Sequence, residues 1–78
     1  MNLTKTMYRL QTALCNRGIY IKINQFQNYS EKIGKMVTKF VVQEKRTMYN
    51  GEEKYVTVLE TYQKPEIVEF LAKMLGGG

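Results

Sequence analysis

Four glutamates stand in pairs of the kind that acid/base chemistry uses. Glu52 and Glu53 follow an Asn-Gly pair, whereas Glu66 and Glu69 lie three residues apart and would share one face of a helix. The chain has no histidine and no aspartate, so it lacks a His-based triad and the commonest metal ligands. Carboxylates in a first helical turn complement the helix dipole, and those at turns are usually solvated. We therefore predict that the chain is not an enzyme and binds no metal or other cofactor.

A single cysteine, Cys15, is the remaining candidate nucleophile. No histidine is present to activate it, and it lies one position off an apolar helical stripe, so we predict that it packs at the edge of that stripe. One cysteine cannot form an internal disulfide, which favours a reducing compartment, and we expect a cytoplasmic protein. The apolar residues are spread along the chain, unlike those of a signal peptide or a spanning helix, so a membrane is not an expected partner. A chain of this size can hardly enclose a pocket, so a small molecule is not an expected partner either.

Positive charge is concentrated near the start of the chain. The first thirty residues hold four cations and no acid: Lys5, Arg9, Arg17 and Lys22. The remaining residues are nearly balanced, within a net charge of +5. Four cations without a local acid suit weak contacts to phosphates, which carry no sequence information. A solvated helix face is the favoured interpretation of the same residues, and phosphate contact is the alternative.

The element that carries these cations is an amphipathic helix between Leu3 and Arg17. Its apolar side chains recur at intervals of three and four residues, as one stripe of a helix does: Leu3, Met7, Leu10 and Leu14. Gly18 suits the left-handed position that ends a helix. Lys5 and Arg9 fall on the opposite side, so the helix presents them to solvent.

Three strands are predicted next. Ile19, Ile21 and Ile23 alternate with polar residues, and a second alternating run covers residues 36–44. Asn50-Gly51 favours a type I′ hairpin, which pairs that run with a third strand over residues 54–62. The segment 25–30, which contains Phe26 and Tyr29, continues the first strand or forms a binding loop, and the sequence leaves this open.

The closing element is a helix that begins at Pro65, with its apolar face formed by Ile67, Phe70, Leu71 and Met74. The order helix, three strands, helix predicts a two-layer α+β fold, with both helices on one face of an antiparallel three-stranded sheet. We expect a single α+β domain over residues 1–75, followed by a flexible glycine tail, 76–78. A chain of 78 residues has room for one small core, so a partner or a second copy would add apolar burial.

Strand alternation divides the sheet residues between its two faces. The face toward the helices is expected to hold Ile19, Ile21, Ile23, Met36, Phe40, Val42, Val56 and Val58. The open face is expected to hold Tyr20, Lys22, Val37, Lys39, Val41, Tyr55, Thr57 and Leu59. The open face therefore combines tyrosines and lysines with more apolar residues than a solvated surface usually carries.

Two resemblances accompany this pattern. The order of elements is similar to that of the double-stranded-RNA-binding domain, but that family's lysines at the start of the last helix are missing, because Lys64-Pro65-Glu66 is acidic after one lysine. Met36-Val37-Thr38-Lys39 and Leu59-Glu60-Thr61-Tyr62 look like segments of short uncharacterised proteins of Gram-positive phages and prophages. That resemblance implies a bacterial cytoplasm and a small accessory role, without any activity to transfer.

The sequence thus predicts a binding module whose partner is another protein or a second copy of the chain. The candidate protein interface on the open sheet face is Tyr20, Val37, Val41, Tyr55 and Leu59. The alternative is weak, sequence-independent nucleic-acid binding through Lys5, Arg9, Arg17, Lys22 and Lys39.

Overall fold

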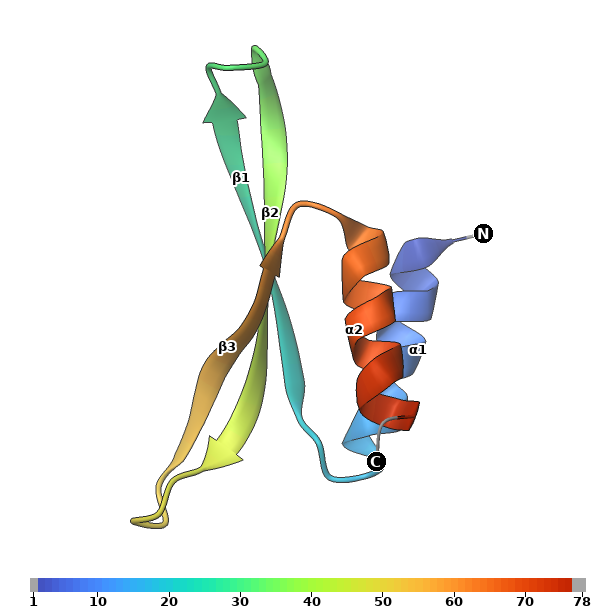
Figure 1. Ribbon diagram of the computed structural model, residues 1–78, viewed down its shortest axis with the longest axis vertical. Coiled ribbons are helices and arrows are strands. Elements are labelled where there is room, and N and C mark those ends of the chain that lie inside the picture. Colours follow the sequence, from blue (N-terminus) through green and yellow to red (C-terminus); the bar gives the residue numbers. More distant parts are fainter. Residues whose placement is uncertain (1, 77–78) are drawn as a thin grey trace.

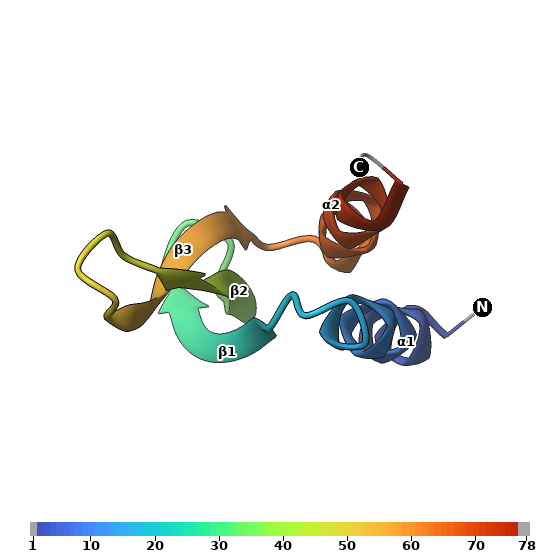
Figure 2. The same ribbon diagram turned by 90° about the horizontal axis from the view of Figure 1, so that it is seen from below.

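The computed structural model describes residues 2–76 of the chain. Helix α1, strands β1, β2 and β3, and helix α2 follow in chain order, with the bounds Leu3–Cys15, Ile21–Ser30, Lys35–Thr47, Glu53–Thr61 and Lys64–Gly76. The strands pair antiparallel in the order β1-β2-β3, and both helices lie on one face of the sheet (Figure 2). This arrangement confirms the predicted α+β fold. Of the predicted glycine tail, Gly76 belongs to α2, and 77–78 lie outside the described residues.

Helix α1 begins and ends where the sequence supplies caps. The side-chain Oδ1 of Asn2 accepts a hydrogen bond from the backbone N–H of Lys5 at 3.2 Å, which satisfies one of the free amides of the first turn. At the other end Gly18 has a φ of 83°, and the N–H of Ile19 donates to the carbonyl of Leu14 at 2.9 Å. This left-handed turn ends the helix at Cys15, two residues before the predicted end.

The hairpin between β2 and β3 forms at Asn50-Gly51, but its turn differs from the expected type I′. Only Gly51, with a φ of 86°, has a positive φ, and Gly51 N–H donates to the carbonyl of Met48 at 2.9 Å. The loop is therefore a type I turn followed by a left-handed glycine, the usual three-residue hairpin. The expected two-residue turn was wrong because Asn50 stays at negative φ.

The core lies between the two helices and the centre of the sheet. The helices contribute Met7, Leu14, Ile67 and Leu71, and the strands contribute Ile21, Phe40 and Val42. All seven side chains belong to the stripes and strand positions that the alternation of the sequence assigns to the interior. Figure 2 shows α1 beside β1 and α2 beside β3, so each helix lies over a different outer strand on the same face of the sheet.

One part of the sheet extends well beyond this core. Strand β2 has 13 residues and β3 only 9, and the last residue of β3, Thr61, pairs with Phe40. Beyond that point β1 and β2 continue as a two-stranded ribbon, residues 26–39, which we term the β-arm. It rises past the ends of both helices at the top of Figure 1.

The β-arm makes the molecule elongated. Its extents are 44 × 33 × 16 Å, and its radius of gyration is 14.2 Å. A compact domain of this length has a radius of gyration of about 11–12 Å. Met36, predicted to face the helices, lies on their side of β2 but on the β-arm, where 57% of the side chain is exposed. The predicted face is correct, but the helices do not cover Met36, because strand alternation fixes a face and not whether anything covers it.

Candidate functional site

Three of the expected open-face residues, Tyr20, Lys22 and Tyr55, lie close together on the side of the sheet that is turned away from the helices, which we term the outer face. Lys22 of β1 places its Nζ 4.3 Å from the centre of the Tyr55 ring of β3, and Lys45 of β2 lies 5.3 Å from the Tyr20 ring. These cation–π pairs link the three strands across the outer face. Tyr20, Lys22 and Tyr55 are thus brought together as the sequence predicted.

The centre of the outer face is polar, and its side chains are hydrogen-bonded to one another. Asn24 Nδ2 donates to Gln43 Oε1 at 3.1 Å, and Gln43 Nε2 donates to Thr57 Oγ1 at 3.4 Å. Beside this amide row, Lys39 Nζ forms an ion pair with Glu60 at 2.9 Å. The surface therefore offers a partner fewer apolar contacts than strand alternation led us to expect.

Leu59, one of the predicted interface residues, packs against the core instead of lying on the outer face. The pairing of β2 and β3 shifts by one residue between Val42 and Gln43, so that Leu59 faces Val42 while Thr57 faces Gln43. The extra residue, Val58, forms a β-bulge, and both Val58 and Leu59 contact the core. The placement of Leu59 was wrong because a bulge reverses the alternation within a strand.

The two valines of the candidate interface lie far apart along β2. Val41 sits between Asn24 and Glu60 in the three-stranded part, whereas Val37 faces Asn28 on the β-arm. Both are half-buried. The five predicted residues therefore do not form one apolar patch.

Among residues 2–76, four of the nine exposed large hydrophobic side chains lie on the β-arm, and the other five, all tyrosines, lie elsewhere on the molecule. Strand β1 includes the whole of residues 25–30, so the segment whose structure the sequence left open is a strand. On the β-arm, four large side chains are exposed by half or more: Phe26 52%, Tyr29 62%, Ile33 56% and Met36 57%. Their exposure depends on where β3 ends, because its pairing with β2 stops at Phe40 and Thr61, and the alternation of the sequence does not mark that end.

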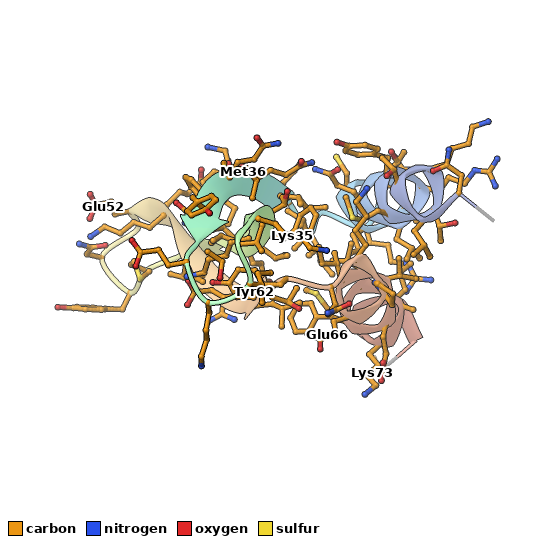
Figure 3. The ribbon with its side chains drawn as sticks, turned by 90° about the horizontal axis from the view of Figure 1, so that it is seen from above. Lys35, Met36, Glu52, Tyr62, Glu66 and Lys73 are labelled. Atoms are coloured by element: carbon orange, nitrogen blue, oxygen red, sulfur yellow. The ribbon has the colours of Figure 1, made fainter. Side chains whose placement is uncertain are left out.

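Tyr29 and Met36 are cross-strand partners on the helix side of the ribbon, and Phe26 faces Lys39 on its outer side. Figure 3 looks down on the tip of the β-arm, where Met36 stands apart from both helices. Both faces of the β-arm therefore present apolar surface to solvent.

The predicted phosphate-binding residues are dispersed. Arg17 donates from Nη1 to the carbonyl of Leu75 at 2.8 Å, near the end of α2, and Lys22 stacks on the outer face. The hydrogen bond from Lys39 to Glu60, with the charge of that carboxylate, raises the pKa of Lys39 above its ordinary value of 10.5. Only Lys5 and Arg9 remain side by side, on the exposed side of α1.

A shallow depression of about 330 Å³ runs along that side of α1, lined by Lys5, Tyr8, Arg9 and Thr12. All four residues come from one helix at positions three or four apart, so the depression is a strip of helix surface. It places two cations beside a tyrosine ring that is about half exposed.

The paired glutamates have structural partners. Glu66 accepts a hydrogen bond from the hydroxyl of the buried Thr61, and Glu69 forms an ion pair with Lys73 at 3.2 Å on the outside of α2 (Figure 3). Glu52 and Glu53 pair with lysines of the adjoining strands. Cys15 is exposed at the end of α1, so its predicted packing at the edge of the stripe was wrong.

No helix in residues 2–76 has the length and apolar character needed to cross a membrane. Comparison with protein-family models, curated proteins and solved structures found no match to this chain. The resemblances to phage proteins and to the double-stranded-RNA-binding domain therefore stay predictions.

Proposed function

We propose that this chain is a small, non-enzymatic binding module that acts through a protein interface centred on the β-arm. The single observation that carries the proposal is the exposure of Phe26, Tyr29, Ile33 and Met36 on a ribbon that no other element covers within residues 2–76. Exposed apolar clusters bounded by polar residues are typical of interaction sites. A two-stranded ribbon is only marginally stable alone in water, so a partner that covers the β-arm also stabilises it.

The β-arm is a better binding surface than the centre of the outer face. There, the side chains of Asn24, Gln43 and Thr57 already satisfy one another, and Lys39 already pairs with Glu60. A partner that covers those groups has to remove water from them without supplying new hydrogen bonds. On the β-arm, burial of aromatic and methionine side chains is favourable without that cost.

The test removes the apolar surface of the β-arm. We expect the double variant Tyr29→Ser, Met36→Ser to lose the associations that the wild-type chain forms, measured by sedimentation for self-association and by quantitative capture from bacterial extract for other proteins. Tyr49→Ser is the matched control, because Tyr49 is fully exposed at the tip of the other hairpin. A double variant that keeps every association of the wild type contradicts the proposal.

A second candidate function, contact with a polyanion, rests on the distribution of ion pairs. Within residues 2–76 the cations that precede Lys39 form no ion pair, whereas the ion pairs join cations from Lys39 onward to glutamates. Uncompensated cations release counterions when they meet phosphates, so log K falls with log salt by about 0.9 per phosphate on a duplex and about 0.7 on a single strand.

The Lys5→Ala, Arg9→Ala variant tests this second candidate. We expect it to flatten the salt dependence of binding to a labelled single strand or duplex, whereas Lys54→Ala, which alters a cation paired with Glu52, leaves it unchanged. Binding that is absent at about 50 mM salt, or an unaltered slope in the double variant, contradicts polyanion binding.

A further inference from the structure

Strand β1 is an edge of the sheet that lacks the usual protection against pairing with another strand. It has ten residues, contains no proline, carries one charged residue, Lys22, and pairs with β2 without a bulge. Proteins normally block such an edge with charges, proline, bulges or a covering element. A long, regular and nearly uncharged edge strand is therefore a template for a further strand.

The backbone groups available on this edge follow from the hydrogen-bond pattern. The carbonyl of Tyr20 accepts from the N–H of Lys45 at 2.9 Å, so Tyr20 and every second residue after it face β2. As this alternation requires, the carbonyl of Ile21 points away from β2, where Gln11 Nε2 of α1 donates to it at 2.7 Å. The next residues that face the open edge are Ile23, Gln25, Gln27 and Tyr29. Within residues 2–76 no strand lies on this side of β1 to bond with their backbone groups, because β1 is an outer strand in the order β1-β2-β3.

We propose that a second copy of this chain pairs its β1 antiparallel with this edge, about a two-fold axis that passes beside Phe26. This inference rests on the proposed protein-binding function and identifies the partner. In this register Phe26 faces Phe26 of the second copy, and the flanking pairs are Ile23 with Tyr29, Gln25 with Gln27, Asn24 with Asn28, and Lys22 with Ser30.

The composition of β1 favours this register. Each aromatic or amide residue meets a residue of its own kind or an aliphatic one, and aromatic and β-branched cross-strand pairs stabilise antiparallel sheets. Phe26 turns its backbone toward β2, so the two Phe26 residues form a non-hydrogen-bonded pair, in which side chains approach most closely. Symmetric registers centred on Gln25 or Gln27 instead place Phe26 opposite Asn24 or Asn28. No like charges face each other in the proposed register.

The same pairing also covers the exposed side chains on the helix side of the β-arm. A two-fold axis perpendicular to the sheet joins the two sheets into one continuous sheet, with the helices of both copies on the same face. Because the strands run antiparallel, the β-arm of each copy then lies alongside the helix-covered part of the other. Tyr29 and Met36, on the helix side of the β-arm, thereby gain the cover that their own chain does not provide.

The edge ladder supplies about eight backbone hydrogen bonds, because four residues of each copy face the other. Such a ladder buries less area than the roughly 1,200–2,000 Å² of a standard interface, so docking of the β-arm against the neighbouring helix layer contributes the rest. The expected complex is a symmetric dimer whose formation depends on protein concentration.

Matched proline variants test which edge of the β-arm pairs with the second copy. Gln27 and Thr38 are direct partners in the β-arm, and their backbone N–H groups point to its opposite edges. Proline at either position therefore removes no hydrogen bond within the chain. In sedimentation from about 1 µM to 1 mM, we expect the wild type and Thr38→Pro to form dimers and Gln27→Pro to stay monomeric. Circular dichroism verifies that both variants are folded.

A cross-linking experiment tests the register without relying on those variants. In a Cys15→Ser background, Phe26→Cys places two thiols across the two-fold axis with Cα atoms about 4.5 Å apart, within the range of a disulfide. We expect this chain to form a covalent dimer on mild oxidation. Asn24→Cys is the control, since its two copies lie about 13 Å apart in the proposed register and form far less cross-link.

The outcomes separate this inference from the function on which it rests. A wild-type monomer at every concentration, a dimer that persists in Gln27→Pro, or equal cross-linking at positions 24 and 26 overturns the pairing of β1. Loss of a captured protein in the Tyr29→Ser, Met36→Ser variant, alongside a monomeric wild type, leaves the protein-binding function intact while it removes the second copy as the partner.

Discussion

The two edges of the sheet differ in how they are protected. β3 carries charged side chains at Glu53, Lys54 and Glu60, and the bulge at Val58 interrupts its pairing with β2. β1 is of similar length but has one charge and no bulge. Charges and bulges are the features that keep natural edge strands from pairing with other chains. β3 therefore has the features of a protected edge strand, whereas β1 lacks them, as the proposed pairing of β1 with a second copy requires.

The bulge in β3 serves the core as well as the edge. It turns two consecutive side chains, Val58 and Leu59, toward the helices, so that a nine-residue strand still covers α2. β1 lacks this device, and its second half continues into the β-arm with side chains exposed on both faces. The protected edge thus belongs to the compact part of the molecule and the unprotected edge to the projecting part.

The largest expected effect concerns the bulge. Leu59→Lys should lower the free energy of unfolding by at least about 2 kcal/mol, because it places a charge against the core. Thr57→Lys, one position beyond the bulge on the outer face, should change it by less than about 0.5 kcal/mol. Urea denaturation followed by circular dichroism measures both. Equal effects at the two positions would show that the bulge does not turn Leu59 inward.

The next variants add a charged side chain to β1, of the kind that β3 already carries. Phe26→Lys and Phe26→Glu each place like charges across the proposed two-fold axis, and each should raise the dissociation constant of the dimer at least about tenfold. An equimolar mixture of the two variants should associate, because the opposite charges then face each other. Sedimentation of the separate and mixed variants measures this. A mixture no tighter than the separate variants contradicts the register.

Much of the fold was predictable from local patterns. The alternation of Ile21, Ile23, Phe40 and Val42 assigned these residues to the inner face, and all four are in or against the core. Glycine at position 18 marked the end of the first helix. These predictions succeeded because each depends on side chains and dihedral preferences within a few residues.

The candidate site was less predictable because it depends on where strands begin, end and shift. Nothing in the residues around Leu59 signals the one-residue shift at Val42 that turns it inward. Met36 was assigned to the correct face of β2, but its exposure follows from β3 ending at Thr61. Pairing between distant segments fixed both outcomes, and a single sequence records such pairing only indirectly.

A smaller effect on stability is expected from the hydrogen bond that Gln11 donates to the backbone carbonyl of Ile21, on the open edge of β1. Gln11→Ala removes the hydrogen bond to the carbonyl of Ile21 and should lower the free energy of unfolding by about 1 kcal/mol. Thr12→Ala, at an exposed position on the same helix, should have a smaller effect. Thermal unfolding of the three proteins tests this. An effect no larger than that of Thr12→Ala would show that solvent replaces Gln11 at this edge without loss.

The smallest effect on stability concerns the two ion pairs between β2 and β3, Lys39 with Glu60 and Lys45 with Glu53. Hydrogen bonds and the charges of Glu60 and Glu53 raise the pKa of Lys39 and of Lys45 above the ordinary value of 10.5. A raised lysine pKa contributes stability that is fully present below the unfolded value and is lost as pH rises through the folded value. Both lysines are partly solvated, so the contribution is small.

The wild-type chain should therefore lose stability between about pH 10 and pH 12 more steeply than the Lys39→Arg, Lys45→Arg variant, whose guanidinium groups stay charged in that range. The two proteins differ only at these two positions, so the difference between their urea midpoints isolates the contribution of the lysines. Identical pH profiles would show that these pairs contribute nothing to stability. The charges beside β3 would then serve only to keep that edge from pairing, which is the property that β1 lacks.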